Sequence, residues 1–186
     1  MTLTQKIFSG CAALVLAMVA LGVTTWFLMS QGARGAEITK AYRVPQLERV
    51  AAIELNVTRA SLQVRHLILS RTPEEAATTL ADIGRLLGVL DESVAAFGKA
   101  TTDDAGRQAF VPIPGLLGQF KTTATQNVQL IQQGRKDEAF AFLVEKTIPA
   151  RNALLGPLEA EKQRQSQLLA KEMGLIVDEA YLALYV

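Results

Sequence analysis

The sequence predicts an all-α protein in which an N-terminal transmembrane helix is followed by an antiparallel up-down four-helix bundle. Three observations predict this fold class. Near the N-terminus, a run of uncharged residues from Ile7 to Met29 exceeds the about 20 residues that a helix needs to span a bilayer. After it, apolar residues recur at seven-residue intervals, as they do on packed helices. No stretch alternates apolar and polar residues with a period of two, and no Asn-Gly or Asp-Gly hairpin dipeptide occurs.

The composition excludes several function classes. The 186 residues carry 19 basic and 18 acidic side chains, a net charge of +1, and show no basic excess of the kind that nucleic-acid binding requires. The single cysteine, Cys11, and the single histidine, His66, exclude an internal disulfide, most metal sites and a Cys-His nucleophile pair. No nucleophile is spaced to meet a base, and no phosphate-binding glycine loop occurs, so we expect neither an enzyme nor a cofactor.

The N-terminal segment divides into residues 1–6, on the cytoplasmic side, and a transmembrane helix over residues 7–29. Trp26, near the far end of that helix, suits the aromatic belt of a membrane interface. A cleaved signal peptide is the alternative, since Lys6 supplies its positive start. The apolar region of a signal peptide is shorter, about 7–15 residues, which favours the uncleaved helix. In either case the bundle, residues 33–186, is expected beyond the membrane.

The first bundle helix is expected over residues 37–71 and carries two apolar lines. One line has the spacing of a packed heptad seam, and the other runs along nearly the opposite side of the helix. A helix with two apolar stripes needs two partners. One is the rest of its own bundle; the other is either a second copy of the chain, giving a homodimer, or further helices of a monomeric bundle that encloses it. The seam comprises Val50, Ile53, Val57, Ala60, Val64 and Leu67, and the second line, the predicted dimer interface, comprises Leu55, Leu62 and Leu69.

A sharp corner follows at residues 70–77, SRTPEEAA. Pro73 disfavours helical geometry at Thr72, which ends the first helix, and it fits the first position of a new one. Thr72 is the expected N-cap, and Glu75 can reach back to the Thr72 backbone N–H to complete a capping box. A corner this short makes its two helices antiparallel neighbours.

Three further helices complete the predicted bundle. The second is expected to end near Gly98, and the third to begin after a polar turn, with Pro112 and Pro114 kinking it or delaying its start. Asn127 falls at a core position of the third helix, either as a register-setting polar residue or as a rim residue. Gly134 ends that helix. The fourth has polar residues at several core-like positions, which predicts a helix that is partly solvent-lined or part of a wet interface; these residues are Glu161, Gln165 and Glu172.

Taken together, these features resemble a known family. After the transmembrane helix come, in order, a helix ending in residues 66–71, the Thr-Pro-Glu-Glu corner, the motif Ile83-Gly84-Arg85, the run QGRKDEA at residues 133–139, and a long last helix with Ile148-Pro149. Their order and spacing are similar to those of the four-helix-bundle ligand-binding domain of methyl-accepting chemotaxis proteins, which is found also on some sensor kinases and cyclases.

The resemblance implies a dimeric periplasmic sensor, in the bacterial inner membrane, that binds a small solute and passes a displacement down its last helix. It also implies that a second transmembrane helix and a signalling region, which would engage a cytoplasmic histidine kinase and an adaptor, belong after Val186. On this view the chain is a fragment of a longer receptor. The alternatives are the sensor domain of a membrane histidine kinase or cyclase, and a membrane-anchored helical interaction module.

The resemblance also suggests a ligand site. In amino-acid receptors of that family, arginines on the first helix grip a ligand carboxylate across the dimer interface. Arg59 and Arg65 occupy the comparable part of this helix, and arginine can hold a carboxylate through two parallel hydrogen bonds. His66 lies seven residues after Arg59 and could join such a site or sense pH. Solvated surface side chains are the alternative for all three.

Overall fold

The computed structural model of the chain describes residues 12–27, 30 and 39–185. The described residues divide into two compact units. One comprises Pro45–Ser166, and the other comprises the described parts of Met1–Val44 and Gln167–Val186. Every regular element in these ranges is helical, which confirms the all-α prediction.

The predicted transmembrane helix, residues 7–29, falls partly outside the described residues, at 7–11 and 28–29. Residues 12–27 form a helix whose side chains are mostly exposed. Within the described ranges, no helix combines the length and the apolarity needed to cross a membrane.

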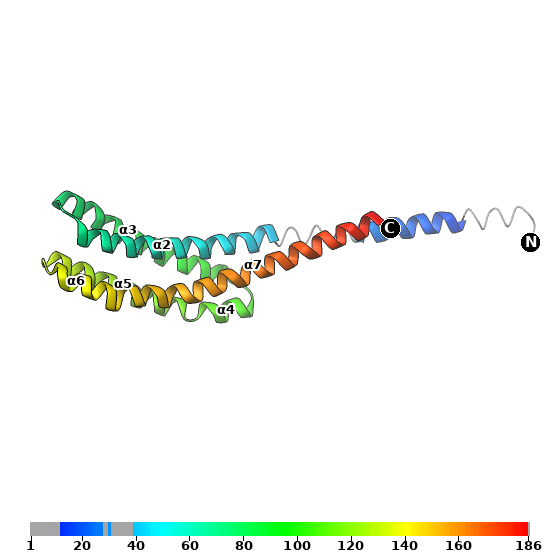
Figure 1. Ribbon diagram of the computed structural model, residues 1–186. Coiled ribbons are helices and arrows are strands. Elements are labelled where there is room, and N and C mark those ends of the chain that lie inside the picture. The colour runs from blue at the N-terminus through cyan, green and yellow to red at the C-terminus, as the bar shows by residue number, and fades with distance from the viewer. Residues whose placement is uncertain (1–11, 28–29, 31–38, 186) are drawn as a thin grey trace, which may run out of the picture. The chain divides into compact units, whose positions relative to one another are not determined.

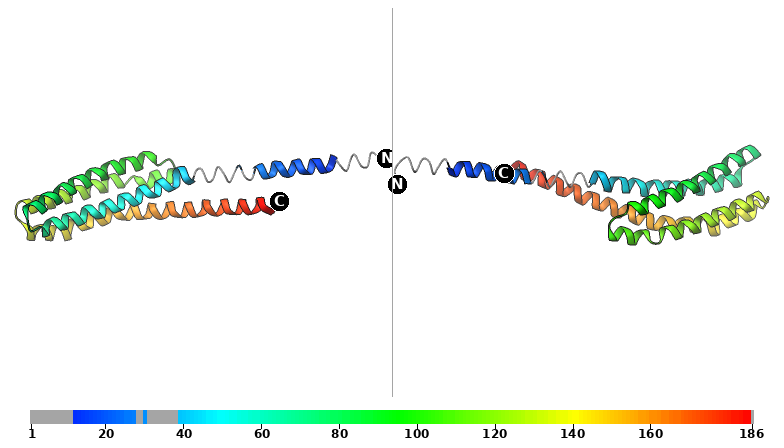
Figure 2. Two further views of the ribbon diagram at one scale, coloured as in Figure 1. Left: turned by 90° about the horizontal axis from the view of Figure 1, so that it is seen from above. Right: turned by 180° about the vertical axis from the view of Figure 1, so that it is seen from behind.

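Four helical runs lie alongside one another in the unit Pro45–Ser166, as predicted for a four-helix bundle (Figures 1 and 2). The first and second runs are single helices. The third is divided into two helices, and the fourth passes through a π-helix before its long final helix. In chain order the elements are η1 (Thr39–Arg43), α2 (Val44–Leu69), α3 (Pro73–Ala100), α4 (Asp104–Phe110), α5 (Ile113–Gln132), α6 (Lys136–Phe142), η2 (Leu143–Thr147) and α7 (Ile148–Tyr185).

The predicted heptad seam of α2 faces the core of the bundle. All six of its side chains are buried, with at most 3% exposure. They pack against apolar side chains of the other runs in two contiguous clusters. Phe97 and Phe120 are the largest buried side chains of the first cluster, and Leu143 is a fully buried member of the second. The heptad pattern therefore identified the core side of α2 correctly.

The corner between α2 and α3 has Thr72 as its N-cap, as predicted. The Thr72 hydroxyl accepts a hydrogen bond from the Glu75 N–H at 3.1 Å. The Glu75 side chain differs from the predicted capping box, because its Oε2 accepts from the Arg71 N–H at 2.9 Å. Its other oxygen, Oε1, lies 3.0 Å from Nε2 of His66, at the end of α2. The carboxylate thus links the two helices across the corner.

As predicted, α3 ends near Gly98, since its last residue is Ala100; the glycine itself lies in the last turn of the helix. Its role is in packing, since a Cβ at this position would lie 2.5 Å from Cζ of Phe110. The Phe110 ring packs edge-on against Phe97, with ring centroids 5.7 Å apart. The glycine therefore allows an aromatic ring of α4 to approach the backbone of α3, a requirement that the sequence of α3 alone does not show.

Two chain reversals follow the predicted chemistry. Asp103 caps α4 by accepting from the Gly106 N–H at 2.7 Å. Pro112 directly precedes α5, which begins at Ile113, and Pro114 lies in the first turn of that helix. Gly134 ends α5 with a φ of +79°, in the left-handed region that favours glycine. The fourth run then begins at Lys136, so the loop is short.

Candidate functional site

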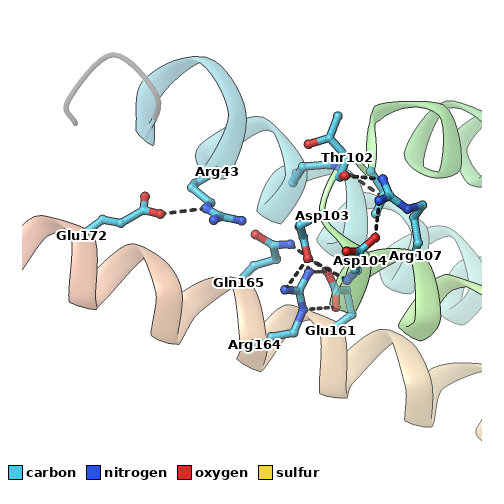
Figure 3. Close-up of polar contacts among 12 residues, drawn as sticks. Arg43, Thr102, Asp103, Asp104, Arg107, Glu161, Arg164, Gln165 and Glu172 are labelled. Atoms are coloured by element: carbon cyan, nitrogen blue, oxygen red, sulfur yellow. Dashed lines mark hydrogen bonds and ion pairs between the residues drawn. The ribbon is translucent and has the colours of Figure 1, made fainter. Parts of the chain in front are cut away.

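Polar side chains of α7 are buried inside the bundle. Glu161 and Gln165 are each 1% exposed, so the prediction of a partly solvent-lined helix is wrong for both. A buried carboxylate requires a partner. Arg164 supplies it, with Nε 2.7 Å from Oε2 of Glu161 and Nη2 2.8 Å from Oε1 (Figure 3). Glu172 is the third polar residue that the sequence places at a core-like position of the fourth helix. It belongs to the other unit, where its Oε1 lies 3.0 Å from Nε of Arg43.

Arg164 also reaches the start of α4. Its Nη1 donates to Oδ1 of Asp103 at 2.9 Å, and the same oxygen accepts the capping hydrogen bond from Gly106. The pKa of the Arg164 guanidinium is raised above its ordinary value, first by its hydrogen bonds to Glu161 and then by those to Asp103. Arg164 therefore stays charged and holds two carboxylates, one from its own helix and one from the connection between α3 and α4.

Amide and hydroxyl groups extend this arrangement. Gln165 donates from Nε2 to Oε1 of Glu161 at 2.7 Å. Gln46, fully buried near the start of α2, donates from Nε2 to the Thr101 hydroxyl at 3.3 Å. Gly106 lies between Thr101 and Arg164. A Cβ at this position would lie 2.7 Å from Cγ2 of Thr101 and 2.8 Å from Nη2 of Arg164. We call these side chains the polar cluster; its members are Gln46, Thr101, Asp103, Glu161, Arg164 and Gln165.

The polar cluster can hold helices in register. Its members come from α2, from the connection between α3 and α4, and from α7. Two of its hydrogen bonds, from Nη1 and Nη2 of Arg164 to the Asp103 carboxylate, join α7 to the start of α4. Because hydrogen bonds depend steeply on distance and angle, a shift of α7 along its axis would break this connection. The arrangement contains no nucleophile beside a base; its chemistry is that of a structural linkage.

The second apolar line of α2 is exposed on the bundle surface. Leu55, Leu62 and Leu69 are 50, 52 and 67% exposed. The alternative in which a monomeric bundle encloses α2 is therefore wrong for the described chain. A line of three leucines at seven-residue intervals remains uncovered on one side of α2.

Arg59, Arg65 and His66 are exposed on the same helix. Arg59 follows Leu55 by four residues and His66 follows Leu62 by four, so each lies next to a leucine on the helix surface. Across the described ranges, neither arginine makes a hydrogen bond or an ion pair. The structure thus places all three predicted ligand residues beside the leucine line, and no hydrogen bond joins any of them to another.

A polar hollow of about 410 Å³ lies beside His66, between α2 and α3. Its lining includes the carboxylates of Glu74, Glu75 and Asp82. The pKa of Glu75 is lowered, first by the hydrogen bond from the Arg71 N–H and then by that with His66. His66 is therefore part of the corner, where a carboxylate of its own chain is its partner.

The polar cluster as a whole cannot be predicted from the sequence. The signal for its α7 part was present, because residues three and four apart on a helix are neighbours and Glu161, Arg164 and Gln165 have that spacing. The contribution of Asp103 has no such signal. Its role as an N-cap is local, but its pairing with Arg164 depends on how the runs pack.

The comparisons with known proteins agree with this architecture. A family model described as a four helix bundle sensory module for signal transduction matches residues 1–174. No curated protein matches the chain at a significant level. The family match covers nearly the whole chain, including all four runs of the bundle. The chain therefore belongs to the family of four-helix-bundle sensory modules of chemotaxis signal transducers.

Proposed function

We propose that this chain is the ligand-binding part of a bacterial methyl-accepting chemotaxis transducer and that a small solute bound to it shifts the last helix of the bundle. The family match supports the sensory role. The observation that carries the rest is the exposed face of α2, on which a line of leucines lies beside two arginines and a histidine. The proposed location is the bacterial inner membrane, with residues 7–29 as the span and the bundle in the periplasm.

The leucine line supports a homodimer. Burying a leucine side chain fully contributes about 1.5–3 kcal/mol. Two α2 helices that meet along Leu55, Leu62 and Leu69 would bury these side chains and leave the opposite seam undisturbed in the bundle core. Such an interface uses the same surface of both copies, as a two-fold dimer requires.

The cationic residues support a ligand site at the edge of that interface. The guanidinium groups of Arg59 and Arg65 have no partner in the described part of the chain, so both are available to a carboxylate. His66 lies on the same face of α2 as Arg59, two helical turns further along, since the two are seven residues apart. A solute with one or more carboxylates would therefore bind between the two copies.

Ion pairs between runs support transmission through α7. Nζ of Lys162 lies 2.6 Å from Oε2 of Glu54 on α2, and Arg164 binds Asp103 at the start of α4. A solute that favours one arrangement of the α2 helices would shift α7 through these contacts. Since α7 continues as one helix to Tyr185, a displacement at Arg164 would be carried along it.

The test combines oligomeric state with ligand binding. Sedimentation velocity of the full 186-residue chain in detergent should show a dimer, and thermal-shift measurements should identify a stabilising solute among acidic amino acids, dicarboxylic acids and aromatic carboxylates. Arg59→Ala should abolish that shift, whereas Arg85→Ala, an exposed arginine on α3, should not. Solute binding that is unchanged in both Arg59→Ala and Arg65→Ala would contradict the proposed site.

A further inference from the structure

A second hollow lies on the opposite pair of helical runs, in the groove formed by α5, α6 and η2. Its volume is about 600 Å³, within the range of small-ligand sites. We propose that this groove binds a zwitterionic solute, an α-amino acid with an apolar side chain, within a single chain. The groove contains no residue of the α2 face, so this site is separate from the one proposed between two copies.

The walls of the groove are fixed by a buried amide. Asn127 on α5 is fully buried, so its interpretation as a rim residue is wrong. Its Nδ2 donates to the Ala139 carbonyl on α6 at 3.0 Å and to the Thr147 hydroxyl on η2 at 3.4 Å. Thr147, also fully buried, donates in turn to the Thr123 carbonyl at 3.5 Å. These contacts hold the two walls in place before any ligand arrives, which lowers the cost of binding.

The π-helix supplies the charges. Glu145 and Lys146 are neighbours on η2 and both line the groove. Short π-helical segments inside longer helices are frequent at functional sites. Neither side chain takes part in an ion pair within the ranges that the structure describes. The ammonium of Lys146 suits the carboxylate of an amino acid, and the carboxylate of Glu145 suits its ammonium.

The other two charged side chains of the groove, Arg135 and Glu138, form an ion pair with each other. Arg135 donates from Nε to Oε1 of Glu138 at 2.8 Å and from Nη2 to Oε2 at 2.6 Å. This pair raises the pKa of Arg135 and lowers that of Glu138, because each hydrogen-bonds the charged form of the other. The four charges sum to zero, so the groove favours a zwitterion over an anion or a cation.

The remaining lining fits the rest of such a solute. Leu130 and Phe142 are half-buried and give the groove an apolar surface for the side chain. Gln126, Gln129 and Gln133 present amides that can donate and accept hydrogen bonds. Apolar surface combined with a few polar groups is the usual composition of a small-molecule site.

The test uses isothermal titration calorimetry of the full chain in detergent with L-leucine as the probe. We expect saturable binding. L-leucinamide, which lacks the carboxylate, and N-acetyl-L-leucine, which lacks the ammonium, should bind at least about tenfold more weakly, because each loses a charge-assisted contact. Lys146→Gln and Glu145→Gln should each weaken L-leucine binding by about tenfold or more. Lys171→Gln, an exposed lysine of α7 outside the groove, is the matched control and should leave the affinity unchanged.

The variants also separate this site from the α2 face. Arg59→Ala should leave L-leucine binding unchanged if the groove is the site. Binding that is lost in Arg59→Ala but kept in Lys146→Gln would place the amino acid at the α2 face and overturn the inference. The absence of saturable L-leucine binding, or equal affinity for L-leucine and its two derivatives, would overturn it as well and would leave the α2 proposal standing.

Discussion

Arg164 and Asp103 are 61 residues apart in the sequence, yet their side chains are joined by a hydrogen bond of 2.9 Å (Figure 3). Asp103 caps α4 with the same oxygen, so the start of that helix and the middle of α7 depend on one carboxylate. Arg164 in turn holds Glu161, which is almost fully buried. Removal of the guanidinium would therefore leave a buried carboxylate without its charge partner.

The first prediction concerns this buried charge. Arg164→Met should lower the free energy of unfolding by about 3–5 kcal/mol, because breaking a buried pair leaves an uncompensated ion. Urea unfolding followed by circular dichroism measures the loss. The double variant Arg164→Met/Glu161→Leu should recover much of it, since it removes both charges.

A surface ion pair provides the control for this measurement. Arg85 is exposed on α3, and its Nη2 lies 3.2 Å from Oδ1 of Asp82. Arg85→Met should leave the urea midpoint almost unchanged, because exposed pairs contribute little. Equal losses in Arg164→Met and Arg85→Met would show that the polar cluster does not stabilise the bundle.

The second prediction compares two glycines of α3. Gly98→Ala should destabilise the protein by about 1–3 kcal/mol, because the added methyl would overlap the Phe110 ring. At Gly84 the same substitution meets no atom within 4 Å and should stabilise the helix by up to about 1 kcal/mol. Thermal unfolding of both variants gives the comparison. A stabilising effect at both positions would contradict the close packing of α3 and α4.

The third prediction concerns pH. The folded pKa of Glu75 is lowered from its ordinary value of 4.5, so the stability it contributes is present above about pH 4.5 and is lost as the pH falls through the lower folded value. Glu75→Gln should therefore unfold at a lower temperature than the parent chain at pH 7, and the difference should shrink in acid. Glu92→Gln, which removes another exposed carboxylate of α3, is the control for the loss of one charge from this helix. A difference between Glu75→Gln and the parent that is constant with pH would contradict the assignment.

The sequence predicts the parts of this fold that depend on local chemistry. The Thr72 cap, the Gly134 turn and the buried side of α2 follow from spacing and residue type, and the structure confirms them. The roles of Gly98 and Asp103 do not follow from local chemistry alone. Gly98 accommodates a ring from the next helix, and Asp103 is paired with an arginine of α7, so both roles depend on contacts between distant segments.

The same distinction applies to the candidate sites. Spacing places Arg59 and His66 beside the leucine line, because four-residue neighbours on one helix follow from geometry alone. It cannot show that His66 is bound to Glu75 of the following helix. Nor can it reveal the groove between α5 and η2, which depends on the buried contacts of Asn127 across three elements.

The last prediction concerns the leucine line of α2. Leu62→Glu places a charge at the centre of the proposed interface, where a second α2 would meet it, and two like charges repel across a two-fold axis. The variant should sediment as a monomer in detergent at concentrations at which the parent chain is dimeric, with unchanged helical content by circular dichroism. Val111→Glu introduces the same charge at another exposed apolar residue, between α4 and α5, and should remain dimeric. A Leu62→Glu variant that sediments like the parent would exclude this face as the contact between copies.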